Sequence, residues 1–97
     1  MILKYTPEAL ADFRAILKYG HETFGYATAE AYGAGLIDKI DILGDHPKAG
    51  RPLQSHPAQF RSLRYRAHLV FYQIGNEHIT IIRILDARQN WRALRLD

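Results

Sequence analysis

The spacing of apolar and polar positions changes twice along this chain. Residues 2–5 (ILKY) form a short apolar stretch typical of a strand, and a helical period follows it. Thr6, Pro7 and Glu8 are typical of a helix start, because a hydroxyl caps the first turn, proline suits its first position and an acid favours the positive end of the helix dipole. Apolar residues then recur at 9, 10, 13, 16, 17 and 24. Gly25 is expected to end this first helix.

A second helical period runs from about residue 27 to residue 44. Its apolar face carries Ala29, Tyr32, Leu36, Ile40 and Leu43. Gly44 and Pro47 both oppose its continuation. Because only one to three residues separate the two periods, we expect residues 8–44 to form an antiparallel helical hairpin.

Beyond the second helix the spacing becomes that of strands. Residues 47–60 hold three of the four prolines and show neither period, which indicates a loop. β-Branched and aromatic residues dominate 61–65 (RSLRY), 68–74 (HLVFYQI) and 78–85 (HITIIRIL), which predicts three antiparallel strands. The expected fold is α+β in the order β-α-α-β-β-β, with the helical hairpin packed on one face of a small antiparallel sheet. At 97 residues, the chain is expected to form a single domain, 1–97.

Composition excludes several kinds of site. The chain has no cysteine, so disulfides and thiolate metal sites are ruled out. Of its five histidines, His68 and His78 lie at opposite ends of the predicted hairpin, about 20 Å apart, and none shows metal-binding spacing. We therefore expect no metal and no cofactor. No stretch approaches the ~18 apolar residues of a membrane span, and MILKYTPEAL lacks a signal-peptide pattern, so we expect a cytoplasmic protein without a membrane partner.

The net charge of +3 is unevenly distributed. Residues 1–48 carry five basic and seven acidic groups, whereas residues 49–97 carry eight arginines, no lysine and three acids. Arginine forms forked contacts with carboxylates and phosphates, so an anionic partner is one interpretation and ordinary solubilising charge is the other. Arg61 and Arg64 are separated by an odd number of positions, so they should point to opposite faces of the sheet. Only one of them can join an exposed patch.

Arg83 stands within the apolar run of the last predicted strand. Strand alternation places it on the same side as Ile79, Ile81 and Leu85, which predicts a mixed apolar and cationic face. Such a face suits a peptide or helix that carries apolar groups and carboxylates. The alternative is an internal salt bridge from Arg83 to Asp86 or to an acid of a helix.

Several segments together resemble the RelE/ParE superfamily of bacterial type II toxins, and the resemblance covers essentially the whole chain. The segments are YTPEALADFRAILKYG, AYGAGLIDKIDILGDHPKAGRPL, FRSLRYRAHLVFYQI and ITIIRILDARQNW. The resemblance implies the β-α-α-β-β-β fold and one of two activities. RelE-like toxins cut messenger RNA in the ribosome, whereas ParE-like toxins inhibit DNA gyrase and are not known to act as nucleases.

The residue types favour the ParE-like branch. A RelE-like ribonuclease would use Arg61, Arg64, Arg83 and Arg88 as cations around the scissile phosphate. It would also need a group to handle the proton of the 2′-hydroxyl, which arginine cannot do because it is always protonated. No lysine follows Lys48, and Leu94 or Leu96 stands near where the superfamily has a tyrosine.

The resemblance also implies a target and a partner. Toxicity is expected to require Arg83, Arg88, Trp91 and Arg92, since tryptophan and arginine are frequent binding hot spots; the alternative for Trp91 is a staple of the C-terminal tail on the sheet. A ParD-like antitoxin is expected to neutralise the toxin through contacts with Leu36, Ile40, Arg61, Arg64 and Arg83. Direct DNA binding is expected only through that antitoxin. A non-toxic interaction module of the same fold is a third possibility.

Overall fold

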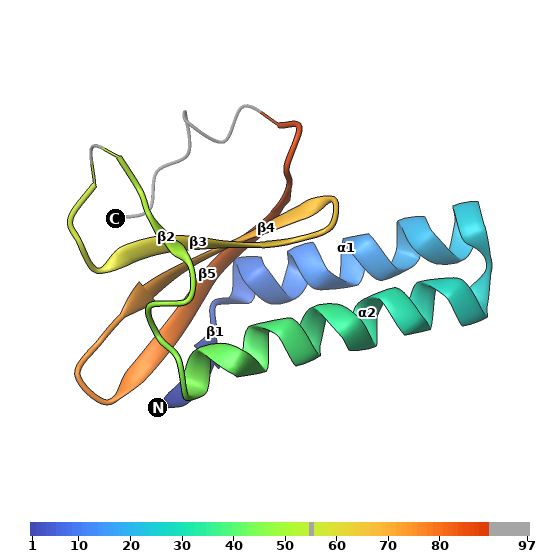
Figure 1. Ribbon diagram of the computed structural model, residues 1–97. Coiled ribbons are helices and arrows are strands. Elements are labelled where there is room, and N and C mark those ends of the chain that lie inside the picture. The colour runs from blue at the N-terminus through green and yellow to red at the C-terminus, as the bar shows by residue number, and fades with distance from the viewer. Residues whose placement is uncertain (55, 90–97) are drawn as a thin grey trace.

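The computed structural model describes residues 1–54 and 56–89, in which two helices pack against one face of a five-stranded sheet (Figure 1). The helices are α1 (Pro7–Phe24) and α2 (Tyr26–Asp41), and the short 3-10 helix η1 (Ile42–Gly44) continues α2. The strands are β1 (Ile2–Tyr5), β2 (Arg51–Pro52), β3 (Phe60–Tyr65), β4 (His68–Ile74) and β5 (His78–Asp86). These elements confirm the predicted α+β fold class.

The sheet is mixed, with the strand order β1-β5-β4-β3-β2. The strands β3, β4 and β5 pair antiparallel, as predicted, and β2 pairs antiparallel with β3, but β1 pairs parallel with β5. The expectation of a purely antiparallel sheet is therefore wrong for its first strand. A long helical connection separates β1 from the other strands, and such a connection allows a strand to pair either parallel or antiparallel. Sequence spacing therefore did not determine the direction in which β1 and β5 pair.

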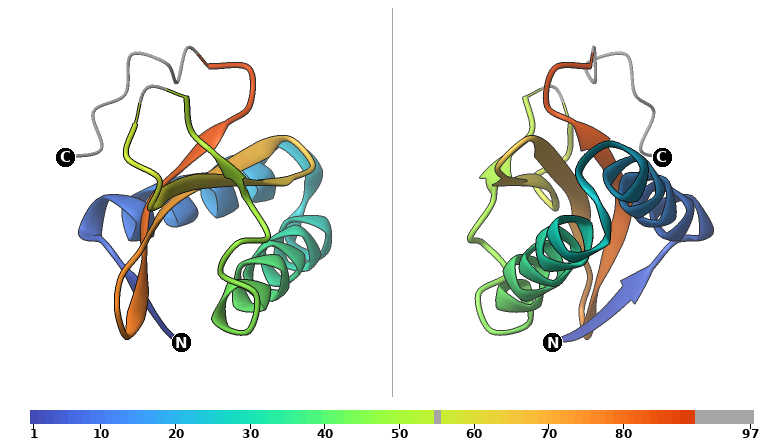
Figure 2. Two further views of the ribbon diagram at one scale, coloured as in Figure 1. Left: turned by 60° about the vertical axis from the view of Figure 1, so that its left-hand side comes forward. Right: turned by 90° about the vertical axis from the view of Figure 1, so that its right-hand side faces the viewer.

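The helical hairpin has the predicted ends. The Thr6 hydroxyl accepts a hydrogen bond from the Ala9 amide at 3.0 Å, and Pro7 opens α1. Gly25 ends α1 with a φ of 90°, a conformation that other residues rarely adopt, and α2 begins at the next residue. Figure 2 shows the two helices lying side by side on the same side of the sheet.

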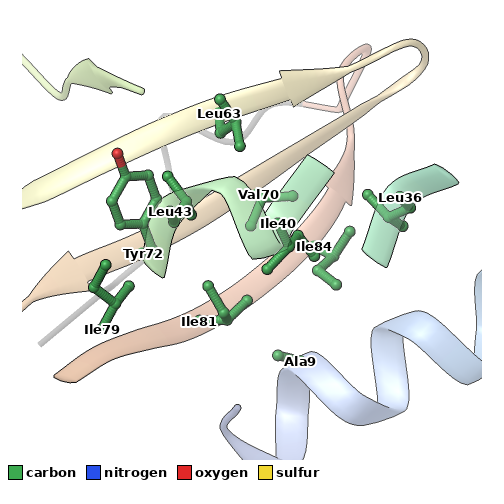
Figure 3. Packing of buried hydrophobic residues seen from close by; sticks show 10 residues of the cluster. All are labelled: Ala9, Leu36, Ile40, Leu43, Leu63, Val70, Tyr72, Ile79, Ile81 and Ile84. Carbon is green, nitrogen blue, oxygen red and sulfur yellow. The ribbon is translucent and has the colours of Figure 1, made fainter. Parts of the chain in front are cut away.

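The main core lies between the hairpin and the sheet (Figure 3). Its buried members are Ala9, Leu36, Ile40, Leu43, Leu63, Val70, Tyr72, Ile79, Ile81 and Ile84. Leu36 and Ile40 are both 0% exposed. The apolar side chains of α2 therefore pack on the protein's own sheet, and in this structure neither of these two residues is accessible for the expected contact with an antitoxin.

A β-bulge in β5 alters the predicted alternation of side chains. Phe71 of β4 pairs with Arg83, but the next residue, Tyr72, pairs with Ile81, so Ile82 is an extra residue in β5. Ile79 and Ile81 consequently belong to the core under the helices. The expectation that they share a face with Arg83 is wrong, because one inserted residue reverses the alternation between them.

The segment 47–60 is more ordered than a simple loop. It contains the two-residue strand β2, which is too short to show a period in the sequence. The Tyr72 hydroxyl donates to Pro47 O at 2.6 Å and accepts from Gly50 N at 3.0 Å. A Cβ at position 50 would lie 2.5 Å from Ser62 O, so the loop can approach the sheet this closely only with glycine there. No helix of the described residues is long and apolar enough to cross a membrane.

Candidate functional site: the open face of the sheet

The face of the sheet opposite the helices carries two rows of side chains that cross the strands. Directly paired residues of neighbouring strands share a face, so the rows follow from the register. One row is Arg51, Ser62, Phe71 and Arg83, and the other is Arg64, Leu69 and Leu85. We call these seven residues the open face. A second apolar cluster, built on Leu53, Phe60 and Phe71, lies on this side, so the face mixes arginines with apolar groups as predicted, although with different members.

Arg83 is held by a carboxylate of α1. Its Nε donates to Asp12 Oδ2 at 2.7 Å and its Nη2 donates to Asp12 Oδ1 at 3.0 Å. The side chains are 31% and 15% exposed, respectively, and the hydrogen-bonded carboxylate raises the pKa of Arg83. The alternative interpretation, a salt bridge to an acid of a helix, is confirmed. This positive charge is therefore already neutralised within the chain.

The position of α1 explains this ion pair. Beyond the end of β1, the first turns of α1 lie along the edge of β5 and bind its free backbone groups. The Thr6 hydroxyl donates to Ile82 O at 2.7 Å, and Asp12 Oδ2 accepts from Ile84 N at 2.9 Å. Asp12 thus satisfies an edge amide and the Arg83 guanidinium together, which fixes α1 to β5.

Arg61 and Arg64 lie on opposite faces, as predicted. Arg61 pairs with Tyr72 on the helix side, whereas Arg64 pairs with Leu69 on the open face. The Arg61 Nη1 donates to Gly50 O at 2.7 Å, so this side chain supports the loop. Arg64 is exposed, and its Nε donates to Arg66 O at 2.8 Å. Of the two, only Arg64 is placed to meet a partner on the open face.

Arg88 extends into solvent just beyond β5. Its side chain is 87% exposed, and its Nε and Nη2 donate to the carboxylate of Asp86 at 3.0 and 2.9 Å. These hydrogen bonds, together with one from the Arg88 amide, hold the pKa of Asp86 well below its ordinary value. Trp91 and Arg92, the other residues predicted to contact a target, lie outside the described residues.

A polar contact that sequence reasoning missed joins α2 to the start of β4. The Tyr32 hydroxyl lies 2.7 Å from His68 Nδ1, and His68 pairs across the strands with Asp86. Burial lowers the pKa of His68 and raises that of Tyr32. The residues are 36 positions apart, so no local motif could have revealed the contact. In the described part of the chain, no group of three or more histidines and acids could hold a metal ion.

The four arginines predicted for a ribonuclease do not converge on one point. Arg61 supports the loop, Arg83 binds Asp12 and Arg88 binds Asp86, which leaves Arg64 on the open face. Arg51, for which the sequence analysis predicts no role, lies on the same face as Arg64. These two guanidinium groups can bind carboxylates or phosphates, but they cannot accept a proton because arginine is always protonated.

The fold is shared with solved structures of toxins and complexes from bacterial toxin-antitoxin systems. It matches the chromosomal ParDE toxin-antitoxin system from P. aeruginosa with a TM-score of 0.75 and 25% identity, over 89% of this chain and 95% of that one. The toxin-antitoxin complex RelBE2 from Mycobacterium tuberculosis shares the fold at a TM-score of 0.65 and 16% identity, over 91% and 92%. A YoeB/ParE toxin from Agrobacterium tumefaciens shares the fold at a TM-score of 0.63 and 19% identity, over 89% of this chain and 98% of that one.

Sequence comparison narrows this class to one family. The model of the ParE toxin of the type II toxin-antitoxin system parDE matches residues 3–91. Toxin ParE1 of Caulobacter vibrioides is 33% identical over 85 residues, which is 88% of either chain. The protein belongs to the ParE family of type II toxins, and the predicted ParE-like branch is confirmed.

Proposed function

We propose that this ParE-family toxin inhibits DNA gyrase in the cytoplasm and is neutralised by a ParD-like antitoxin. Membership of the ParE family supports the first part, because the resemblance to ParE-like toxins implies inhibition of gyrase. The second part is supported by the solved relative, whose name pairs ParE with ParD. In the toxin–antitoxin complex, we propose that the antitoxin and not the toxin binds DNA.

The pairing of the arginines is the observation that favours gyrase inhibition over RNA cleavage. A ribosome-dependent ribonuclease must surround a scissile phosphate with free cations and supply a proton acceptor. Here Asp12 neutralises Arg83 and Asp86 neutralises Arg88, while Arg61 faces the other side of the sheet. The remaining arginines provide charge without acid-base chemistry. We therefore propose a binding protein and not a nuclease.

Supercoiling by purified gyrase tests this proposal directly. The purified toxin should block supercoiling of relaxed plasmid, and its expression without an antitoxin should block replication and make cells filament. Cleavage of messenger RNA in a translating extract, with gyrase unaffected, would instead establish the RelE-like activity. Harmless expression together with unaffected gyrase and intact RNA would establish a non-toxic interaction module.

Arg88 and Trp91 are proposed as contacts with the target. Because Arg88 is 87% exposed, Arg88→Ala should weaken gyrase inhibition about tenfold without lowering the melting temperature. Arg14→Ala, which removes an exposed arginine from α1, is the matched control and should inhibit like the wild type. For Trp91→Ala, lost inhibition at an unchanged melting temperature indicates contact, whereas a large fall in melting temperature indicates a staple.

Co-expression tests the antitoxin. The small open reading frame beside the toxin gene should restore growth, and its product should co-purify with the toxin. Failure of every neighbouring product to bind the toxin or relieve its effect would contradict this part of the proposal while leaving gyrase inhibition to be judged by its own assay.

A further inference from the structure

A groove runs between residues 49–54 with His56 on one side and β3 on the other. Its volume is about 740 Å³, and its lining includes Arg51, Leu53, His56, Ser62, Arg64 and Leu69. Of the described residues that line it, none is an aspartate or a glutamate. This lining therefore presents positive charge and apolar surface together, without a carboxylate that would offset the charge.

The two arginines of this groove differ from the others of the open face and β5. Arg83 and Arg88 each donate two hydrogen bonds to the carboxylate of one aspartate. By contrast, the described residues provide no carboxylate within ion-pair distance of Arg51 or Arg64. Both side chains are exposed, and Arg64 donates its Nε to the Arg66 carbonyl, which leaves its two terminal nitrogens available as donors to a ligand. The register places them on the same face, because Arg51 is the direct partner of Ser62 and Arg64 lies two residues beyond Ser62 on β3. Like charges at neighbouring positions of one sheet face disfavour each other, and a bound anion relieves this repulsion.

The apolar part of the lining indicates which kind of anion fits. Leu53 and Leu69 belong to the apolar cluster of the open face and lie beside the two arginines. Leu69 is the direct strand partner of Arg64, so an apolar side chain and a guanidinium stand next to each other. Single-stranded nucleic acids are held by aromatic rings that stack on the bases, and none of the described residues that line this groove is a phenylalanine, tyrosine or tryptophan. Aliphatic surface beside arginine suits a peptide that alternates acidic and apolar residues.

We infer that this groove binds an extended acidic segment of the antitoxin, with carboxylates on Arg51 and Arg64 and an apolar side chain on Leu53 and Leu69. The inference rests on the proposed function, because it assigns the antitoxin's contact to one place on the toxin. The proposed antitoxin contact therefore includes Arg64, as expected from the sequence, and adds Arg51. It omits Arg61 and Arg83, because their guanidinium groups are bound within the chain.

Binding measurements on the purified toxin test the inference. The probes are the co-expressed antitoxin and a synthetic peptide of alternating glutamate and leucine. The double variant Arg51→Gln/Arg64→Gln should bind each probe at least about tenfold more weakly than the wild type, since it loses two charge-assisted contacts. The wild-type affinity should fall as salt is raised, and that of the double variant should change less. Arg14→Gln is the control with the same kind of charge removed from α1, and should bind like the wild type.

Three results would overturn the inference. One is equal affinity of the wild type and the double variant for both probes, with the same melting temperature. Another is failure of the wild type to bind either probe. The third is tight, variant-sensitive binding of a single-stranded oligonucleotide with no binding of the peptide, which would make the groove a nucleic-acid site. None of these results depends on gyrase, so failure of gyrase inhibition alone would reject the proposed target and leave the groove assignment standing.

Discussion

The contact between Arg83 and Asp12 shows how one residue can carry both a charge and a structural role. A guanidinium in the middle of an apolar strand is costly unless it is paired and hydrogen-bonded. Asp12 supplies a two-point fork and also binds the Ile84 amide, so one carboxylate satisfies three donors. Loss of toxicity on changing Arg83 would therefore report on folding as well as on target binding.

Asp12→Asn is expected to lower the free energy of unfolding by about 2 kcal/mol, because a charge-assisted fork is replaced by weaker contacts. Urea denaturation measures this change, and Asp38→Asn, at an exposed position of α2, should have little effect. The double variant Asp12→Asn/Arg83→Met should lose less than the two single variants together, since both remove the same interaction. Strict additivity would show that the pair is not coupled.

At the scale of elements, the loop 47–53 depends on one hydroxyl of β4. Tyr72 is fully buried, and its hydroxyl bridges Pro47 O and Gly50 N. Arg61 reaches the same loop through Gly50 O. The wall of the groove that carries Arg51 is thus held by contacts made on the helix side of the sheet.

Tyr72→Phe is expected to destabilise the protein by about 1–3 kcal/mol, because the Gly50 amide and the Pro47 carbonyl lose their partner. Hydrogen exchange at the Gly50 amide should rise more than the global change in stability requires. Tyr26→Phe, which removes a hydroxyl from an exposed side chain, should leave the unfolding transition unchanged. Exchange at Gly50 that merely follows global unfolding would show that the hydroxyl does not hold the loop.

Sequence spacing predicted the helices well and the faces of β5 poorly. The first helix was defined by local signals, Thr6 and Pro7 at its start and Gly25 at its end, which act within one turn. The bulge at Ile82 and the parallel pairing of β1 depend on strands distant in sequence, so no local pattern shows them. The site shows the same division. The sequence predicts that Arg61 and Arg64 lie on opposite faces, but which of them is exposed and which acid binds Arg83 depend on where the helices pack.

In the whole molecule, charge is divided between the two halves of the sequence. Residues 1–48, which include β1 and the helical hairpin, carry five basic and seven acidic groups, whereas residues 49–97 carry eight arginines against three acids. The pair formed by Asp12 and Arg83 joins the helical layer to the sheet at one edge, and the contact of Tyr32 with His68 joins α2 to the sheet. Stability of the whole domain should therefore respond to titration at the boundary between the layers.

Acidification is expected to destabilise the protein through His68. Burial lowers the pKa of His68 below its ordinary value of 6.5, so the unfolded chain binds this proton more readily than the folded chain does. The contribution of His68 to stability is complete above pH 6.5 and is lost as the pH falls below it. Tyr32, Asp86 and Arg88 are the groups around it, and Asp86, whose pKa is lowered, adds a loss only below its ordinary value of 3.8.

Melting temperatures between about pH 7.5 and about pH 5 measure this effect. The wild type should melt progressively lower as the pH falls, and His68→Gln should show a shallower dependence. His46→Gln, which removes an exposed histidine, should retain the wild-type dependence. An identical slope for wild type and His68→Gln would exclude His68 as the source.

Because β5 lies between β1 and β4, the sheet can assemble only late during synthesis of the chain. β1 and both helices are synthesised first, but the strand that joins β1 to the rest of the sheet is synthesised last of the five. The pair of Asp12 with Arg83 spans 71 positions and must also wait for that strand. A chain that stops before residue 78 therefore cannot assemble this sheet, and the fold can form only after β5 has been synthesised.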